Sequence, residues 1–296
     1  MTVLALPELG LGGGPLGNYL RAITDAQAHA VVEAAWEAGV RYFDTAPYYG
    51  LGLAERRLGQ ALRGLPRAGY LVSTKVGRLV RRGPGRPPDF AIPDDRHAAW
   101  DFSRDGVLRS LDDSLTRLGL DHVDVLYVHD PDHHWPQALE EGFATLAELR
   151  AQGVVRAIGV GMNRSGMLAD YVRNADPDVL LAADQATLLR RSAFADLLPL
   201  CHERGVAVVA AGLFHRGGLA TDGAASASPR TRRIADVCAA HGVPVAAAAL
   251  GFPLRHPAIV SVLIGAHEPA HVRAALAALR HPVPEACWAD LDALSP

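Results

Sequence analysis

The stretch Arg41-Tyr-Phe-Asp-Thr-Ala-Pro-Tyr-Tyr-Gly50 joins a short apolar run to a turn and places a carboxylate, Asp44, where the run ends. A phenol, Tyr49, follows five residues later in a segment that contains proline and glycine. A short apolar run bounded by turn residues is typical of a strand that is buried on both faces of a sheet. The stretch therefore predicts a parallel strand with polar groups at its carboxyl end.

Runs of the same kind alternate with helical patterns along the whole chain. Strands are predicted over Gly10–Gly12, Val40–Phe43, Tyr70–Thr74, Val123–Val128, Val155–Val160, Val179–Ala183, Val206–Ala210 and Ile259–Ile264. Helices are predicted over segments such as Thr24–Ala38, Leu53–Arg63, Ser103–Leu118, Pro136–Ala151 and Ala193–Glu203, with Thr24 and Ser103 as N-caps and glycines at 39, 119, 153 and 205 as stops. This alternation, repeated eight times, predicts an α/β protein with a (β/α)8 TIM barrel, as a single domain over residues 1–296.

Two long connections interrupt the alternation. We expect Gly77–Asp101 and Gly212–Pro229 to be loops, because both are rich in residues that favour turns. Both leave the carboxyl ends of predicted strands, the barrel face where active sites are built. Loops of this length in a compact domain are usually functional or mobile. The basic patch Arg78–Arg86 is interpreted as a solvated part of the first loop.

Composition excludes several classes of function. The chain has 296 residues with a net charge of −3, and its basic residues form no continuous run, so we expect no nucleic-acid partner. No apolar stretch reaches the roughly 20 residues of a membrane span, and the N-terminus lacks the pattern of a signal peptide. Three widely spaced cysteines favour reduced thiols and hence the cytoplasm. The expected partner is a small molecule, and the chain is expected to be a monomer or small homo-oligomer.

Four polar side chains meet at the mouth of the predicted barrel. Asp44, Lys75 and His129 each follow an apolar run, and Tyr49 lies on the loop after one. A phenol with a pKa of about 10 is a poor base near neutral pH. A buried ammonium beside it favours the ionised form and is expected to lower that pKa. Each residue alone also fits a structural role, as a turn cap, a solvated lysine, a packing aromatic or a turn histidine.

The motifs around these residues resemble the aldo-keto reductase family. The resemblance is carried by Phe43–Gly50, Ser73-Thr-Lys75, Arg109–Gly119 and Asp124–His129, in the order and spacing of the family. It implies that Tyr49 is the general acid/base, Lys75 lowers its pKa, Asp44 pairs with Lys75, and His129 orients the substrate oxygen. The spacing from Asp44 selects Tyr49 over Tyr48.

Longer passages are similar to the sugar and pyridoxal dehydrogenases of that family. They include the run from Asp44 to Gly59 and the segments Lys75–Leu79, Asp101–Gly106, His129–Asp132 and Gly159–Asn163. The similarity implies oxidation of an aldose of the L-fucose, L-galactose or D-arabinose type at its anomeric carbon, giving the lactone. Substrate contacts are expected from Tyr48, Asp130 and Trp135.

The family resemblance also implies a nicotinamide dinucleotide. It assigns cofactor contacts to Asp44, Asn163, Gln185, Gly212, Leu213, Ile264, Gly265, Ala266, His267 and His271. Members that prefer NADP carry Lys and Arg near the last strand to pair with the 2′-phosphate. This chain has Ala266, His267 and His271 there, with an acidic Glu268, so NAD is favoured. NADP remains an alternative, because the guanidinium of Arg273 could reach its 2′-phosphate.

Other functions remain open at this point. The same four residues serve an NADPH-dependent reductase of aldehydes or ketones working in the opposite direction, or a pyridoxal 4-dehydrogenase. His129-Asp-Pro-Asp-His-His134 suggests a metal-dependent hydrolase, but its spacing resembles no known zinc site, and no metal is expected. A non-catalytic barrel that binds a dinucleotide and regulates a partner is a further alternative of a different class.

Overall fold

A computed structural model describes residues 4–85, 89–92, 95–215, 217–219 and 228–294 of the chain. The predicted loops therefore lie partly outside the described residues, at 86–88 and 93–94 in the first and at 216 and 220–227 in the second.

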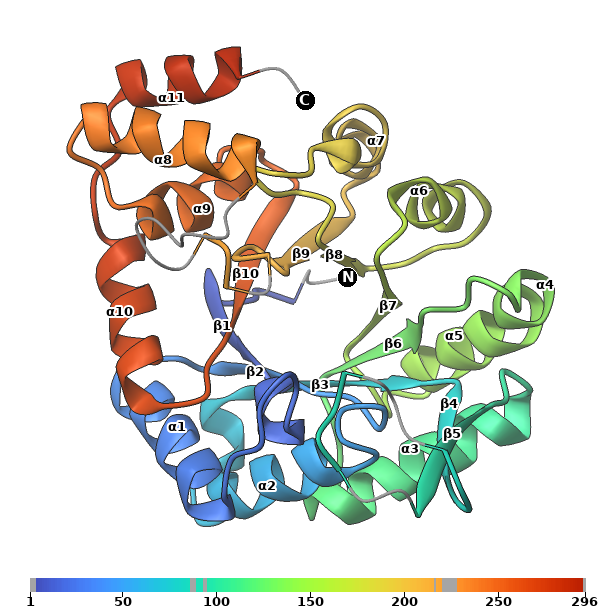
Figure 1. The fold of residues 1–296 in the computed structure, drawn as a ribbon. Coiled ribbons are helices and arrows are strands. Elements are labelled where there is room, and N and C mark those ends of the chain that lie inside the picture. Colours follow the sequence, from blue (N-terminus) through green and yellow to red (C-terminus); the bar gives the residue numbers. More distant parts are fainter. Residues whose placement is uncertain (1–3, 86–88, 93–94, 216, 220–227, 295–296) are drawn as a thin grey trace.

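The described residues form the predicted closed barrel of eight parallel strands (Figure 1). Around the ring the strands follow the order β1, β10, β9, β8, β7, β6, β3, β2. Their bounds are β1 Leu9–Gly12, β2 Tyr42–Asp44, β3 Leu71–Val76, β6 Val125–His129, β7 Ala157–Met162, β8 Val179–Ala183, β9 Ala207–Ala211 and β10 Ile259–Gly265. Most strands end one or two residues later than predicted, so Lys75 and His129 lie inside strands rather than after them.

Helices surround the ring of strands, as Figure 1 shows. They are α1 Asp25–Glu37, α2 Leu53–Leu62, α3 Arg104–Leu118, α4 Trp135–Gln137, α5 Ala144–Ala151, α6 Ser165–Asn174, α7 Leu197–Arg204, α8 Pro229–Ala240, α9 Val245–Leu254, α10 Pro269–Leu279 and α11 Glu285–Ala293. The hydroxyls of Thr24 and Ser103 cap α1 and α3 as predicted. A π-helical turn, Ala138–Phe143, joins α4 to α5, and the helix predicted from Ala193 begins only at Leu197.

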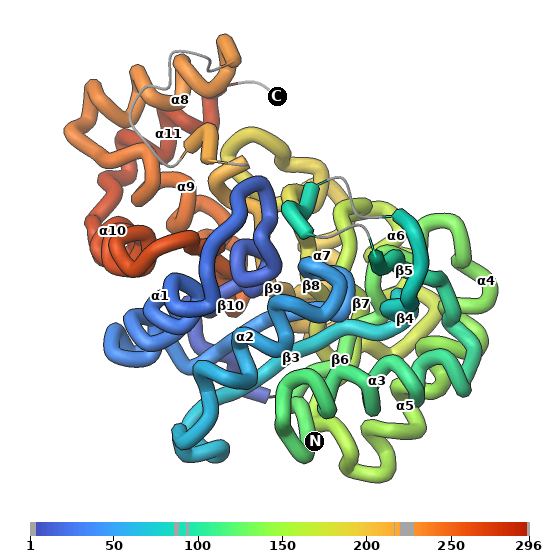
Figure 2. The backbone as a smooth tube through the Cα atoms, turned by 60° about the horizontal axis from the view of Figure 1, so that its bottom comes forward, coloured from blue at the N-terminus to red at the C-terminus, as the bar shows by residue number. Residues whose placement is uncertain are grey.

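The segment Gly77–Asp101 is not simply a loop, which corrects the sequence-based expectation. It contains the antiparallel strands β4 (Arg78–Arg82) and β5 (Arg96–Trp100), with Arg78 opposite Trp100. Figures 1 and 2 place this hairpin beside the end of β3, outside the ring of strands. Arg78 is buried rather than solvated, because the hairpin folds its first residue against the barrel mouth.

The inside of the barrel is filled by side chains from alternate strand positions. Tyr42, Tyr127, Leu181, Val209 and Leu263 belong to this inner cluster. A second and larger apolar layer lies between the strands and the helices. Inner packing is tight enough to require glycine in β7, because a Cβ on Gly159 would lie 1.6 Å from the carbonyl oxygen of Val179.

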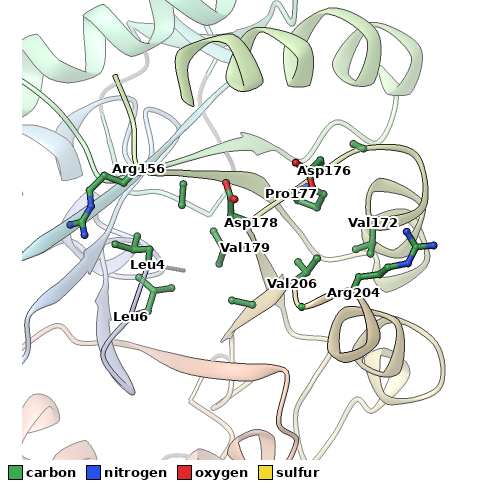
Figure 3. A pocket seen from close by; sticks show the side chains of 14 residues that line it. Leu4, Leu6, Arg156, Val172, Asp176, Pro177, Asp178, Val179, Arg204 and Val206 are labelled. Carbon is green, nitrogen blue, oxygen red and sulfur yellow. The ribbon is translucent and has the colours of Figure 1, made fainter. Parts of the chain in front are cut away.

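A pocket of about 340 Å³ opens at the amino ends of β7, β8 and β9. Leu4 and Leu6 line it together with Val179, while Arg156 and Arg204 stand on opposite sides (Figure 3). This end of a barrel usually serves stability rather than catalysis. The residues expected to carry chemistry lie at the other end of the strands.

Among the described residues, no single helix is long and apolar enough to span a membrane. The pair formed by α8 and α9 passes the same length and composition test together, but it is bent by 99° at the break. Cys201, Cys238 and Cys287 are buried, and in the described part of the chain none of them forms a disulfide.

Candidate active site

A buried ion pair lies at the centre of the barrel mouth. The ammonium of Lys75 donates to both carboxylate oxygens of Asp44, at 2.9 and 2.7 Å, and to the carbonyl oxygen of Thr45 at 2.9 Å. Lys75 is 1% exposed and Asp44 2%. Burial lowers the pKa of Lys75, but the charge of Asp44 and the hydrogen bonds outweigh it, so the pKa of Lys75 lies above its usual range. Lys75 is therefore a fixed cation.

Asp44 is held in place by a chain of hydroxyls inside the barrel. Ser73 donates to its Oδ1 at 2.7 Å, and the hydroxyls of Ser73 and Tyr42 are 3.0 Å apart. Tyr42 in turn lies 3.4 Å from the hydroxyl of Tyr127. Burial raises the pKa of both tyrosines, so they stay neutral and act only through hydrogen bonds. These hydroxyls hold the carboxylate of Asp44, which in turn holds Lys75. No motif in the sequence predicted this row of hydroxyls.

Tyr49 lies between the ammonium of Lys75 and the imidazole of His129. The Lys75 Nζ is 4.8 Å from the centroid of its ring, and the His129 ring meets it edge-on at 5.9 Å. The ring of Phe90 stacks on that of Tyr49, with the two ring centroids 6.1 Å apart. Burial raises the pKa of Tyr49 and wins over the lowering effect of Lys75. The expected net fall in its pKa is therefore wrong for this structure, because the sequence did not show how fully the phenol is enclosed.

His129 is a buried, neutral imidazole. Burial lowers its pKa well below the usual range, and the nearby charges of Arg78 and Lys75 lower it further. Its Nδ1 has no hydrogen-bond partner among the described residues. Its Nε2 lies 3.6 Å from a carboxylate oxygen of Asp130, beyond hydrogen-bond distance. The carboxylate favours a proton on Nε2, which leaves an N–H free to donate to an oxygen placed at the mouth.

Arg78, which the sequence analysis took for a loop residue, completes the mouth. Its guanidinium lies 4.4 Å from the ring centroid of Tyr48 and 4.2 Å from that of Trp100. It donates to Asp130 at 2.5 Å. The structure thus brings Tyr48 and Asp130 beside Arg78 and the central residues, and their role as substrate contacts stays a prediction.

Trp135 lies apart from this group. Its ring packs on Tyr171 of α6, with centroids 4.7 Å apart. Further along the chain, Asp132 pairs with Arg164 and His134 packs on Trp100. Within the described ranges, no three His, Cys, Asp or Glu side chains gather as metal ligands.

The expected cofactor residues lie at the carboxyl ends of β7 to β10. Gln185 follows β8, where its side-chain amide donates to the Asp184 carbonyl at 3.0 Å and accepts from Ser192 at 2.6 Å. Asn163 follows β7 with its side chain exposed. Two amides on one rim fit the carboxamide of a nicotinamide, which both donates and accepts hydrogen bonds.

Small residues dominate the rest of this rim. Gly212 and Gly265 are exposed at the ends of β9 and β10, and Gly212 has a φ of 75°. The side chains of Leu213, Ile264 and Ala266 are buried in the core, so these residues offer only backbone atoms. An exposed glycine-lined backbone beside a helix N-terminus fits a pyrophosphate.

His267 and His271 lie before and within the first turn of α10. The ring of His267 donates to the carbonyl of Tyr19 at 2.8 Å, and the His271 ring lies 3.1 Å from the carboxylate of Glu268. Both rings therefore have partners within this chain. The carboxylate of Glu268 also lies 4.0 Å from the guanidinium of Arg21.

The model of the Aldo/keto reductase family matches residues 8–296. The chain belongs to the aldo/keto reductase family. It is therefore an NAD(P)-dependent oxidoreductase. It is 44% identical to D-threo-aldose 1-dehydrogenase from Pseudomonas sp, over 97% of this chain and 94% of the relative. It is 39% identical to pyridoxal 4-dehydrogenase from Microbacterium luteolum, over 98% and 94% of the two chains.

A solved structure supports the same family. The aldo/keto reductase from Klebsiella pneumoniae, in complex with NADP and acetate, is 26% identical with a TM-score of 0.75. The match covers 98% of this chain and 91% of the other. Nicotinamide binding is thus a property of the family, and the rim that carries Gln185 and Gly265 fits it.

Proposed function

We propose that this aldo-keto reductase oxidises an aldose at its anomeric carbon to the lactone. The observation that carries the proposal is the position of Tyr49, between the fixed cation of Lys75 and the neutral imidazole of His129. A phenol in this position accepts the proton of a hydroxyl when it is ionised, and the Lys75 charge stabilises the phenolate. The likeness to an aldose dehydrogenase over nearly the whole chain supports a sugar as the substrate.

The residues divide the work of the reaction. The anomeric O–H gives its proton to the ionised Tyr49 oxygen. The hydrogen on the anomeric carbon leaves as hydride, with the electron pair of its C–H bond, and the C=O of the lactone forms. A bound nicotinamide, in its oxidised form, supplies the hydride acceptor. His129 donates from Nε2 to the same oxygen and holds it in line. Asp44 and Ser73 keep Lys75 in position through the contacts described above.

NAD is the proposed cofactor. Glu268 lies at the N-cap of α10, and its carboxylate is 3.1 Å from His271 and 4.0 Å from Arg21. A 2′-phosphate near this carboxylate meets a like charge, which favours a cofactor with a free 2′-hydroxyl. The Klebsiella relative with NADP makes NADP the alternative. Three buried cysteines without a disulfide among the described residues support a cytoplasmic location, and we propose a monomer or small homo-oligomer.

A substrate and cofactor screen tests the proposal. L-fucose, L-galactose, D-arabinose and pyridoxal are incubated with NAD or NADP, and the absorbance of the reduced cofactor is followed. The proposal expects turnover of an aldose, faster with NAD. Pyridoxal as the best substrate would favour the second candidate, which the 39% identical relative supports. Activity restricted to aldehydes with NADPH would contradict the dehydrogenase.

A further inference from the structure

One buried guanidinium at the barrel mouth has a donor without an acceptor. Arg78 is 8% exposed, and its Nε has no hydrogen-bond partner among the described residues. Its Nη2 donates to Asp130. Buried polar groups in native proteins nearly always have partners, so an orphan N–H in a binding mouth points to a ligand atom.

The guanidinium is held rigidly. Tyr48 and Trp100 lie within 4.4 and 4.2 Å of its carbon, and Trp100 is its partner in the β4–β5 register. Asp130 is fixed as well, because it has a φ of 41° and its backbone N–H donates to the carbonyl of Gly161 at 3.0 Å. Donor and acceptor are thus presented side by side before a substrate arrives, which reduces the entropy cost of binding.

The charges of the mouth cancel in pairs. Arg78 neutralises Asp130, as Lys75 neutralises Asp44, and His129 is neutral. Because the carboxylate of Asp89 also acts on Tyr48, these groups leave no excess positive charge to favour an anionic substrate. A hydroxyl both donates and accepts, so two neighbouring hydroxyls match one N–H and one carboxylate oxygen.

We propose that Arg78 and Asp130 form a clamp for the hydroxyls next to the anomeric carbon of a neutral sugar, an assignment that rests on the function proposed above. The Nε–H of Arg78 donates to one ring hydroxyl, and the carboxylate of Asp130 accepts from its neighbour. The carboxylate oxygen is only 3.6 Å from His129 Nε2, the donor to the anomeric oxygen, which places the clamp beside the reacting carbon. Arg78 and Asp130 therefore determine specificity for polyhydroxylated substrates.

The competing role is structural, because the same ion pair ties the hairpin to the barrel. A matched pair of substrates separates the two roles. Tetrahydropyran-2-ol undergoes the same oxidation of an anomeric hydroxyl to a lactone but has no other hydroxyl. Arg78→Met is compared with Arg82→Met, which removes an exposed arginine from the other end of β4.

The experiment measures kcat and KM for an accepted aldose and for tetrahydropyran-2-ol with each variant. Arg78→Met is expected to lower the ratio of kcat/KM for aldose over tetrahydropyran-2-ol by roughly ten- to a hundredfold, mainly through KM, as for a lost charge-assisted hydrogen bond. Arg82→Met is expected to keep the ratio. An equal loss on both substrates overturns the clamp.

Two further results keep the outcomes distinct. If Arg78→Met does not fold, Arg78→Lys and Asp130→Asn test the same ratio with the volume of the side chains nearly kept. A ratio unchanged in both folded variants overturns the clamp while the aldose dehydrogenase stands. Failure of the wild type to oxidise any aldose contradicts the proposed function itself, and the sugar clamp with it.

Discussion

The phenol of Tyr49 is enclosed between Lys75, His129 and Phe90, and its burial sets the pH at which it works. Because burial raises its pKa, most molecules carry a neutral Tyr49 near pH 7. Oxidation needs the ionised form. We expect kcat/KM for oxidation to rise with pH through the range 7 to 9, by up to about tenfold per unit, and reduction to show the opposite trend.

Removal of the phenol tests the same residue directly. Tyr49→Phe is expected to lower kcat by roughly 10²–10⁴, the usual contribution of general acid–base catalysis. The pH dependence described above should vanish from any residual activity. Tyr48→Phe is the matched control for proton transfer, because Tyr48 packs on Arg78 and takes no proton in the mechanism, so its loss is expected to change KM more than kcat. Equal losses in both variants would argue against Tyr49 as the proton carrier.

His129 links the site to the stability of the protein. Its pKa is lowered in the folded state, so the unfolded chain binds a proton that the folded protein resists. The contribution of His129 to stability is full above the unfolded pKa of about 6.5 and is lost as the pH falls below it. Urea unfolding at pH 7.5 and 5 is expected to show a smaller difference for His129→Gln than for the wild type. An identical difference would mean that the pKa of His129 is the same in the folded and the unfolded state.

At the scale of the elements, β7 depends on a residue without a side chain. Gly159→Ala would drive a Cβ into the backbone oxygen of Val179, so β7 and β8 would have to separate. We expect a loss of at least about 1–3 kcal/mol in the free energy of unfolding, the usual cost of overpacking, and a lower Tm. Gly166→Ala on α6 is the control, since a Cβ there meets nothing within 4 Å. Thermal melting that shows no difference between the variants would contradict this packing.

The barrel strands were predictable because several are nearly continuous apolar runs and all of them alternate with helical patterns. The hairpin β4–β5 was not. Its residues favour turns and solvent, and only contacts with other segments bury its first arginine. Arg78 lies among Tyr48, Trp100 and Asp130, which come from three separate segments of the chain. A pattern of local composition carries no information about such a contact.

The central residues were easier to find than their electrostatics. Asp44, Lys75 and His129 close apolar runs, and parallel strands bring their carboxyl ends to one rim. The pKa of Tyr49 depends instead on how much water the folded mouth excludes. The hydroxyls that link Tyr127 to Asp44 were not predictable for a related reason, since Tyr42, Ser73 and Tyr127 come from three strands, β2, β3 and β6, and meet only in the closed barrel.

At the scale of the whole molecule, the proposed cofactor residues lie at the carboxyl ends of several strands, β7 to β10. A ligand that binds only the folded barrel stabilises it, by about 2.7 kcal/mol when its free concentration is a hundred times Kd. With equal concentrations, NAD is expected to raise the Tm more than NADP, because Glu268 repels the 2′-phosphate. Glu268→Gln is expected to reduce the difference between the Tm increases caused by NAD and by NADP. A larger rise with NADP in the wild type would contradict the proposed preference.

The strands β4 and β5 form a hairpin that is not part of the barrel, yet this hairpin supplies Arg78, one half of the proposed clamp. The residues of the proposed proton transfer lie on or directly after β2, β3 and β6, which are part of the closed barrel, so changes there endanger folding. The hairpin is free of that constraint. Mutations in the hairpin can therefore change the substrate from a sugar to another alcohol during evolution, while the catalytic residues on the barrel stay the same. Such divergence would produce relatives of similar sequence that act on different substrates. An aldose dehydrogenase and a pyridoxal dehydrogenase, 44% and 39% identical to this chain, fit that expectation.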